Sequence, residues 1–232
     1  MDYHDRHVVV TGGTGALGAA VVAALLEAGA HCHLPYRGAE AGRFAQRGHE
    51  RVRLVPVERL DDEAALAGLY DAVPRLWASI HVAGGFAFAA VEDTTRALLL
   101  AQIEANLLTC YLSCRAAVAA LRKAGGGGRI VNVAARPALE WRMGAKMSAY
   151  TASKAGVAAL TEALAEELAG EGILVNAVAP SIMDTPANRA AMPKADHAAW
   201  PKVEEVARTI LFLASPDNKV TRGAVVPVYG RV

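Results

Sequence analysis

Tyr150 and Lys154 are the two side chains in this sequence best suited to acid–base chemistry. They lie in the segment SAYTASK, residues 148–154, which opens an Ala-rich stretch with helical spacing. Residues four apart on a helix share one face, so the ammonium group would lie beside the phenol. A neighbouring positive charge lowers a tyrosine pKa from its ordinary value of about 10 toward the range useful for general acid and base catalysis. This spacing is also common on helix surfaces, so the pair indicates catalysis only in a suitable context.

A glycine-rich turn supplies that context. The segment TGGTGALG, residues 11–18, follows the strand-like triplet Val8 to Val10 and precedes an Ala/Val/Leu-rich helix. Glycines let backbone N–H groups approach a pyrophosphate at the positive end of a helix dipole. Two registers fit, one with Gly13, Gly15 and Gly18 and the other with Gly12, Ala16 and Gly18, and the sequence does not choose between them. The turn predicts a bound dinucleotide, contacted by Gly12, Thr14, Gly15, Ala16, Leu17 and Gly18.

The end of the second predicted strand indicates which dinucleotide binds. The segment LPYR, residues 34–37, contains no acidic residue that could bind a ribose 2′-hydroxyl. Arg37 is instead suited to a 2′-phosphate, so NADP is favoured and NAD is the alternative. The competing interpretation is that Arg37 is only a solvated loop charge.

His31 and His33 flank Cys32 and could be taken for a metal-binding pair. They lie on one face of a predicted buried strand, and no third or fourth ligand follows at a useful spacing. We therefore expect no metal site.

The elements that must position these residues alternate between strand and helix. Strand-like runs are Val8 to Val10, His31 to Leu34, Arg53 to Val57, Ala78 to Val82, Ile130 to Val133, Ile173 to Val178 and Ala224 to Val228. Predicted helices are Ala16 to Ala28, Asp61 to Ala72, Ala97 to Lys123, Ser148 to Ala169 and Val203 to Ala214. Such alternation predicts an α/β protein with a parallel sheet covered on both faces. Because the sequence contains no repeat or linker, we expect residues 1–232 to form a single doubly wound Rossmann-type domain.

The connection from Ala179 to Lys202 is too long for a simple turn. Long ordered connections often form binding loops, and this one would follow the carboxyl end of a strand, where open α/β sheets bind ligands. We assign residues 179–202 to the substrate. Four large side chains, in this loop and upstream of Tyr150, fit the substrate pocket and core packing equally well: Trp141, Met143, Met183 and Trp200.

Composition narrows the class of partner. The chain has 232 residues, a formal net charge of +1 and 53% hydrophobic residues. This charge balance provides no broad basic surface for nucleic acid. The longest apolar run, Ala19 to Leu26, is far shorter than the roughly 20 residues that cross a membrane. The first residues show no export signal, and three cysteines cannot all pair, so a small-molecule substrate and a cytoplasmic location are expected.

Taken together, these segments resemble the short-chain dehydrogenase/reductase family over nearly the whole chain. The resemblance is carried by TGGTGALG, IEANLLTCYL, GRIVNV, YTASK, VNAVAP and the segment from Pro180 to Thr185. It implies a seven-stranded parallel sheet, a nicotinamide cofactor and an assembly of two or four chains. Such a dimer or tetramer would form through the helices at Ala97 to Lys123 and Ser148 to Ala169.

The resemblance also implies roles for single residues. Tyr150 would give a proton to a carbonyl that receives hydride, and Lys154 would hold the ribose and lower the pKa of Tyr150. Asn106 would support a water-linked proton path. The remaining cofactor contacts would come from Ala83, Gly84, Pro180 and Thr185.

This sequence departs from the family at the position of its catalytic serine. Val133 is followed by AAR, residues 134–136, so no hydroxyl stands there. VAGGF, this AAR segment, GGTGALG and DTPANRAAMPKADHAAW more closely resemble the serine-less quinonoid dihydropteridine reductase branch. A single proton donor suffices where incoming charge spreads over a conjugated ring.

The sequence thus predicts an NAD(P)H-dependent reductase of a small carbonyl or a conjugated, quinonoid acceptor. A quinonoid dihydropteridine reductase proper is one alternative. The other is an inactive NADP-binding sensor or scaffold, favoured by the missing serine.

Overall fold

Seven short apolar runs form one parallel sheet in the computed structural model, which describes residues 1–39, 42 and 44–232. The strands are β1 (His7–Thr11), β2 (His31–Tyr36), β3 (Val52–Pro56), β4 (Leu76–His81), β5 (Gly128–Val133), β6 (Ile173–Pro180) and β7 (Val225–Val228). Across the sheet they lie in the order β3-β2-β1-β4-β5-β6-β7, and each neighbouring pair is parallel. The predicted α/β class and seven-stranded sheet are confirmed.

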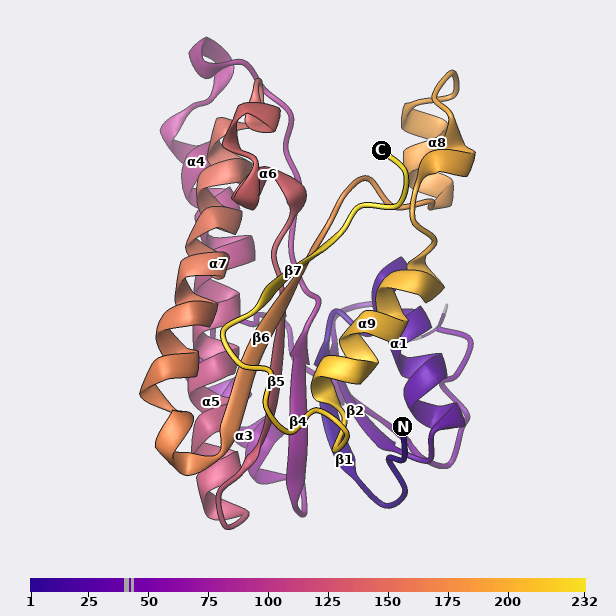
Figure 1. Ribbon diagram of the computed structural model, residues 1–232, viewed down its shortest axis with the longest axis vertical. Helices are drawn as coiled ribbons and strands as arrows, with labels where there is room; N and C mark the ends of the chain where they lie inside the picture. The colour runs from indigo at the N-terminus through magenta and orange to yellow at the C-terminus, as the bar shows by residue number, and fades with distance from the viewer. Residues whose placement is uncertain (40–41, 43) are drawn as a thin grey trace.

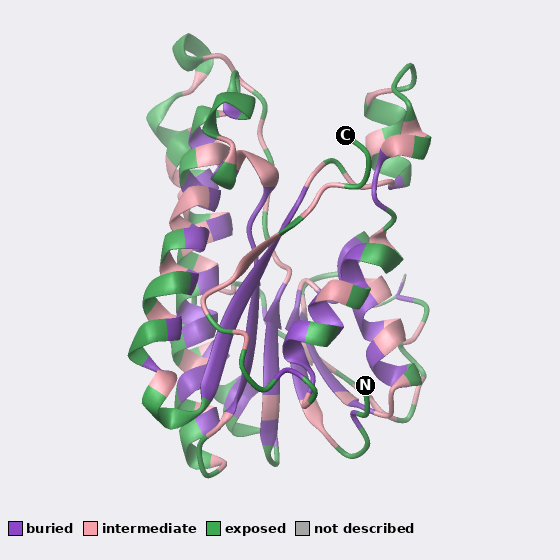
Figure 2. Ribbon diagram, in the orientation of Figure 1, coloured by how far each residue is buried: buried purple, intermediate pink, exposed green. Residues whose placement is uncertain are grey.

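Helices cover both faces of the sheet (Figure 1). On one face lie α1 (Ala16–Glu27) and α9 (Val203–Ala214), and on the other lie α3 (Glu63–Asp71), α5 (Thr109–Lys123) and α7 (Ser148–Glu167). Each layer encloses its own cluster of buried apolar residues. Figure 2 shows β5 and β6 buried along their length and the outer helix faces exposed. This two-sided burial explains why the central strands are continuous apolar runs in the sequence.

Local capping sets the helix ends. We expected a helix from Asp61, but α3 begins at Glu63 because the Asp62 side chain caps it, accepting hydrogen bonds from the N–H groups of Ala64 and Ala65. An N-cap side chain has this effect because the first N–H groups of a helix have no partner within the helix.

The predicted helix from Ala97 to Lys123 is continuous but not uniform. It starts as α4 (Arg96–Gln102), widens into a π-helical segment (Ile103–Leu108) that contains Asn106, and continues as α5. By length and composition the span Arg96–Lys123 could cross a membrane. In this fold its inner side packs into the core, where Cys110, Cys114 and Leu121 are buried.

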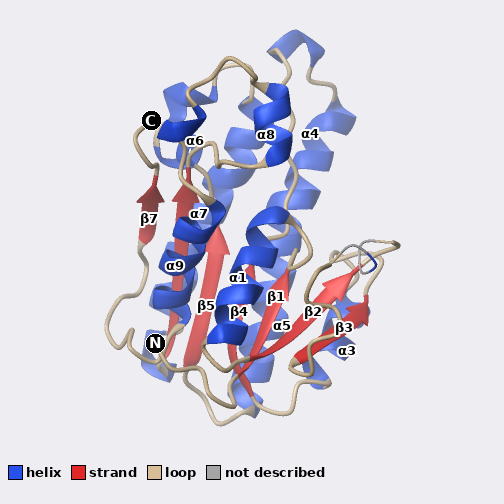
Figure 3. Ribbon diagram, turned by 90° about the vertical axis from the view of Figure 1, so that its right-hand side faces the viewer, coloured by secondary structure: helices blue, strands red, loops and turns tan. Residues whose placement is uncertain are grey.

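Short elements gather beyond the carboxyl ends of the strands. These include α6 (Arg136–Leu139), the turn Trp141–Gly144 and α8 (Pro186–Ala191), none of which we predicted. Figure 3 shows the strand arrowheads pointing toward α4, α6 and α8. The functional residues predicted from the sequence converge at this end of the sheet.

Candidate active site

The glycine-rich turn links β1 to α1 with a backbone that tolerates few side chains. Gly12 has a φ of +68°, and a Cβ there would lie 2.6 Å from the backbone nitrogen of Ala83. A Cβ on Gly18 would lie 2.0 Å from the carbonyl oxygen of Gly12. A Cβ on Gly13 would lie 2.9 Å from the flexible end of the Leu34 side chain and 3.1 Å from the Val10 carbonyl oxygen, a less severe contact. The requirement for glycine is therefore strictest at Gly12 and Gly18, which favours the register with Gly12, Ala16 and Gly18.

One cavity of about 1260 Å³ starts at this turn and continues across the sheet edge to Tyr150. Every predicted site residue lines it: Gly12, Thr14, Gly15, Ala16, Leu17, Gly18, Arg37, Ala83, Gly84, Asn106, Tyr150, Lys154, Pro180 and Thr185. The cavity passes between β1 and β4, where the strand order reverses. Open α/β sheets bind their ligands at such a switch point.

Tyr150 and Lys154 lie in the first two turns of α7. The ring of Phe86 packs edge-on against the Tyr150 ring, with centroids 5.0 Å apart. The buried Lys154 ammonium donates a hydrogen bond of 2.7 Å to the carbonyl oxygen of Val133 at the end of β5. Tyr150 and Lys154 thus share the cavity, while the lysine charge is directed to the β5 carbonyl.

The pKa shifts at this pair differ from our expectation. Burial raises the pKa of Tyr150 to about 12, because an apolar environment disfavours the phenolate. The predicted lowering of the Tyr150 pKa is therefore wrong. Burial lowers the pKa of Lys154 to about 8, since the same environment disfavours its charged form. Tyr150 is thus a protonated phenol at neutral pH.

Asn106 connects the loop after β4 to helix α7. Its Oδ1 accepts from the N–H of Gly85 at 2.9 Å, and its Nδ2 donates to the Gly85 carbonyl at 3.0 Å and to Ser153 Oγ at 3.1 Å. Ser153 in turn donates to the Tyr150 carbonyl. A Cβ on Gly84 would lie 2.6 Å from Asn106 Oδ1, so the glycine permits this close approach. Asn106 fixes the loop that forms one wall of the cavity.

The position of the family's serine holds apolar residues. Ala134 and Ala135 are buried and line the cavity after β5. The Arg136 guanidinium binds Glu140 at 2.9 Å and lies 4.7 Å from the Tyr229 ring centroid. Arg136 is therefore held by these neighbours rather than directed at the position of the missing hydroxyl.

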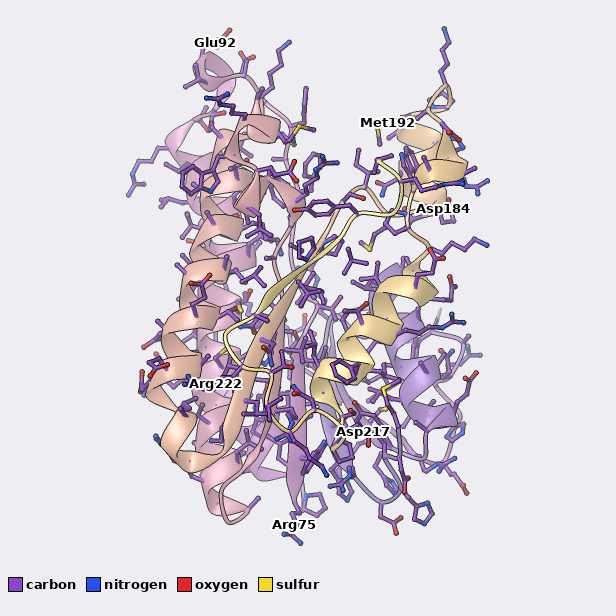
Figure 4. The ribbon with its side chains drawn as sticks, viewed as in Figure 1. Arg75, Glu92, Asp184, Met192, Asp217 and Arg222 are labelled. Atoms are coloured by element: carbon purple, nitrogen blue, oxygen red, sulfur yellow. The ribbon has the colours of Figure 1, made fainter. Side chains whose placement is uncertain are left out.

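The segment 179–202 is more structured than a loop. It begins with the last two residues of β6, and α8 follows Thr185, whose side chain caps that helix by accepting from the Asn188 N–H. In Figure 4, the labelled residues Asp184 and Met192 lie on either side of α8. The segment meets the cavity through Pro180, Ser181, Met183, Thr185 and Asn188.

The four large side chains have different environments. Met183 lines the cavity, whereas Trp200 is buried at 6% exposure. Trp141 and Met143 are exposed and outside the set of residues that line the cavity.

Phe86 also lines the cavity but was not predicted from the sequence. Its place directly after Gly84-Gly85, in the loop that follows a strand, was a usable signal.

Comparison with known proteins identifies the family. The profile described as short chain dehydrogenase matches residues 6–196. This chain belongs to the short chain dehydrogenase family. It is therefore an NAD(P)-dependent oxidoreductase, which confirms the class of enzyme and cofactor expected from the sequence.

Among the named relatives, two cover nearly the whole chain and bear on the substrate. One is the (2S)-[(R)-hydroxy(phenyl)methyl]succinyl-CoA dehydrogenase subunit BbsD of Thauera aromatica, 31% identical over 99% of this chain and 97% of the relative. The other is an acetoacetyl-CoA reductase of Rhizobium meliloti, 30% identical over 97% of this chain and 98% of the relative. Neither name refers to a pterin, so the quinonoid dihydropteridine reductase branch remains a hypothesis.

Solved structures of other proteins have the same fold. The crystal structure of gox2181 has a TM-score of 0.91 and 28% identity, and the match covers 99% of this chain and 96% of that one. ElxO with NADP bound has a TM-score of 0.88 at 23% identity, covering 97% of this chain and 98% of that one, a likeness that concerns the fold alone.

Proposed function

We propose that this protein uses NADP(H) to interconvert a small ketone and its secondary alcohol. The cavity fits a dinucleotide, because it continues from the close backbone approach at Gly12 and Gly18 to Tyr150. Arg37 lines its rim after β2, where Pro35 and Tyr36 precede it and no acid stands. A guanidinium there suits a 2′-phosphate better than a free ribose hydroxyl. The observation that carries the proposal is this single cavity joining the glycine-rich turn to Tyr150 and Lys154.

The bound nicotinamide would supply or accept hydride, and the chain's own side chains would handle the proton. Tyr150 is protonated at neutral pH, so it donates its phenolic proton to the oxygen of a ketone that is being reduced. Lys154, with a pKa of about 8, keeps most of its charge at pH 7 and stabilises the phenolate that remains. Asn106 positions the Gly85 backbone beside them.

The acceptor is expected to have an apolar part. Phe86 stands against the ring of Tyr150, and Met183 lines the same cavity. The two relatives are named for a CoA-linked hydroxy acid and for acetoacetyl-CoA, which supports an oxo or hydroxy substrate.

Ala135 favours a second candidate, a conjugated quinonoid acceptor. A ketone concentrates developing negative charge on one oxygen, and losing one donor there costs about 10²-fold or more. A quinone or quinonoid dihydropterin spreads that charge over a ring, so Tyr150 alone suffices.

Single-turnover hydride transfer separates these candidates. NADPH oxidation would be followed with acetoacetyl-CoA, a cyclic ketone, a quinone and a quinonoid dihydropterin, in wild type and Ala135→Ser. Faster reduction of the ketones than of the conjugated acceptors supports the main proposal, and the reverse supports the second candidate. Tight NADPH binding without transfer to any acceptor would overturn both and leave the sensor or scaffold.

We further propose a homodimer or homotetramer assembled through the Arg96–Lys123 helix and α7. Leu99, Leu108 and Tyr111 are exposed apolar residues along that helix, and apolar side chains of this kind are suited to pairing with a second copy. Light scattering at micromolar concentration tests this, and a monomeric mass would contradict it.

A cytoplasmic location is also proposed. Cys32, Cys110 and Cys114 are free and buried, a state that reducing compartments preserve.

A further inference from the structure

A second cluster of reactive side chains lies inside the core, apart from the cavity. It consists of His81, Cys110 and Cys114, called here the His81 cluster, all three with at most 5% exposure. The imidazole nitrogen and the two sulfur atoms lie within 4.8 Å of one another. None of the three lines the cofactor cavity.

Backbone geometry brings these donors together. Cys110 and Cys114 are four residues apart on α5, so their thiols share the face that packs against the sheet. His81 is the last residue of β4, against which α5 packs. Cys114 Sγ lies 3.5 Å from His81 Nδ1. Around tetrahedral zinc, bonds of about 2.3 Å to sulfur and about 2.0–2.1 Å to nitrogen place those atoms about 3.6 Å apart.

Neighbouring polar groups hold the imidazole in a suitable orientation. Ser79 Oγ lies 2.8 Å from His81 Nε2, and the Tyr70 hydroxyl lies 2.7 Å from Ser79 Oγ. Metal-binding histidines commonly have their second nitrogen fixed by such a hydrogen bond. The hydroxyl oxygen of Ser79 can accept from Nε2, which leaves Nδ1 available to a metal.

Asn132 provides an oxygen on the remaining side. Its Nδ2 donates to Thr161 Oγ1 at 2.9 Å, which directs Oδ1 toward the cluster. Oδ1 lies 2.8 Å from His81 Nδ1 and 3.5 Å from Cys114 Sγ. This amide oxygen is placed to complete a four-coordinate site once His81 Nδ1 no longer donates to it.

We propose that the His81 cluster binds one divalent cation of the zinc class, with Asn132 Oδ1 as the fourth ligand. Two thiols, an imidazole and an amide oxygen without a carboxylate suit zinc rather than magnesium or calcium. Binding releases the two thiol protons, and the His81 proton moves from Nδ1 to Nε2, where it is donated to Ser79. Two thiolates balance the charge of the cation, so the filled site is neutral, as a buried site requires.

Such a site would tie α5 to β4 and β5 from within the core. Its role is structural, because the cavity with Tyr150 and Lys154 is complete without it. The competing interpretation is a hydrogen-bonded core with no ligand.

Metal stoichiometry after refolding tests the proposal. Because the cluster is buried, the full chain is unfolded in urea with reductant and refolded with ZnCl₂ or CoCl₂, then freed of excess metal. We expect about one metal ion per chain, thiolate-to-cobalt charge-transfer bands, and a Tm about 5 °C or more above the metal-free protein. Cys110→Ser and Cys114→Ser should lose the metal.

Cys32→Ser is the matched control. Cys32 is also buried, on β2 in the opposite core layer, so its replacement should leave the stoichiometry unchanged. Pulsed alkylation of the wild-type protein provides a readout that does not depend on variants that fold. Zinc should protect Cys110 and Cys114 but not Cys32. The proposal is overturned if the wild-type protein refolds fully without retaining metal. It is also overturned if zinc changes the alkylation of none of the three thiols.

Discussion

Replacing Gly18 by alanine tests how closely α1 packs on the glycine-rich turn. The new methyl group would lie 2.0 Å from the Gly12 carbonyl oxygen and 2.7 Å from the Gly13 Cα. Both atoms belong to the backbone, so no side chain can rotate away to make room. The helix must shift outward, away from β1 and from the cavity that the turn lines.

The magnitude follows from two opposing effects. Alanine inside a helix is favoured over glycine by up to about 1 kcal/mol. Adding a methyl group to a tightly packed position costs about 1–3 kcal/mol, and contact with rigid backbone places this site at the upper end. We therefore expect a net loss of about 2 kcal/mol in the free energy of unfolding. For a domain of this size the loss corresponds to a Tm lower by about 4–8 °C.

Gly15→Ala is the matched control in the same turn. Gly15 is the N-cap of α1 with a φ of −78°, and a Cβ there meets only the Gly12 oxygen, at 3.4 Å. Stability should change by no more than about 0.5 kcal/mol. NADPH affinity should still fall, because the methyl group faces the cavity that Gly15 lines.

Urea denaturation and NADPH fluorescence titration distinguish the two variants. Gly18→Ala should lose both stability and affinity, and Gly15→Ala should lose affinity alone. A Gly18→Ala protein as stable as wild type would refute the close-packing argument. Equal destabilisation in both variants would refute the assignment of different roles to the two glycines.

Three further changes address the active site and the buried His33 on β2. Tyr150→Phe should remove most turnover, by about 10²-fold or more, and leave NADPH affinity nearly unchanged, because the phenol acts in the transition state; full activity would contradict the proposed role. Arg37→Ala should weaken NADPH binding about 10–100-fold and leave NADH binding unchanged, and titration of both cofactors measures this. Burial lowers the pKa of His33 to about 4. The unfolded chain therefore gains a proton below about pH 6.5 before the folded chain does, and stability should fall by about 2 kcal/mol between pH 7.5 and pH 5. Parallel urea denaturation of His33→Asn should lack most of this dependence, and identical pH curves would show that another group is responsible.

The sequence was sufficient to predict the strands of the sheet and the long helices. Runs of three to six residues predicted each strand within about two residues, and the α9 bounds, Val203–Ala214, matched without correction. The short helices α6 and α8 were missed because they lack an apolar period of their own. Each instead follows a strand that ends at the cavity, and Thr185 caps α8. The π-helical turn at Asn106 was also invisible, since no residue type marks it.

The sequence predicted which residues lie at the site but not how their surroundings shift their pKa values. The motif residues line one cavity as expected, yet the predicted direction of the Tyr150 pKa shift was wrong. Sequence spacing gives only the distance along α7, whereas the pKa depends on burial and on where the Lys154 ammonium is directed. The sequence analysis considered a metal site only at His31 and His33. It did not consider His81, because Cys110 and Cys114, which lie beside it in the fold, are about thirty residues away in the sequence. The spacing of Cys110 and Cys114, four residues apart in a helical stretch, was the usable signal.

The raised pKa of Tyr150 determines which proton-transfer step this side chain is ready to perform at neutral pH. A phenol with a pKa of about 12 holds its proton throughout the neutral range, so it is ready to donate to a ketone. Oxidation of an alcohol requires the phenolate, whose stabilisation depends on the positive charge of Lys154 in the same cavity. Lys154, buried with a pKa of about 8, can lose its own proton at mildly alkaline pH, which would remove that charge. The same burial thus raises the pKa of the proton donor and lowers the pKa of the lysine that stabilises its phenolate.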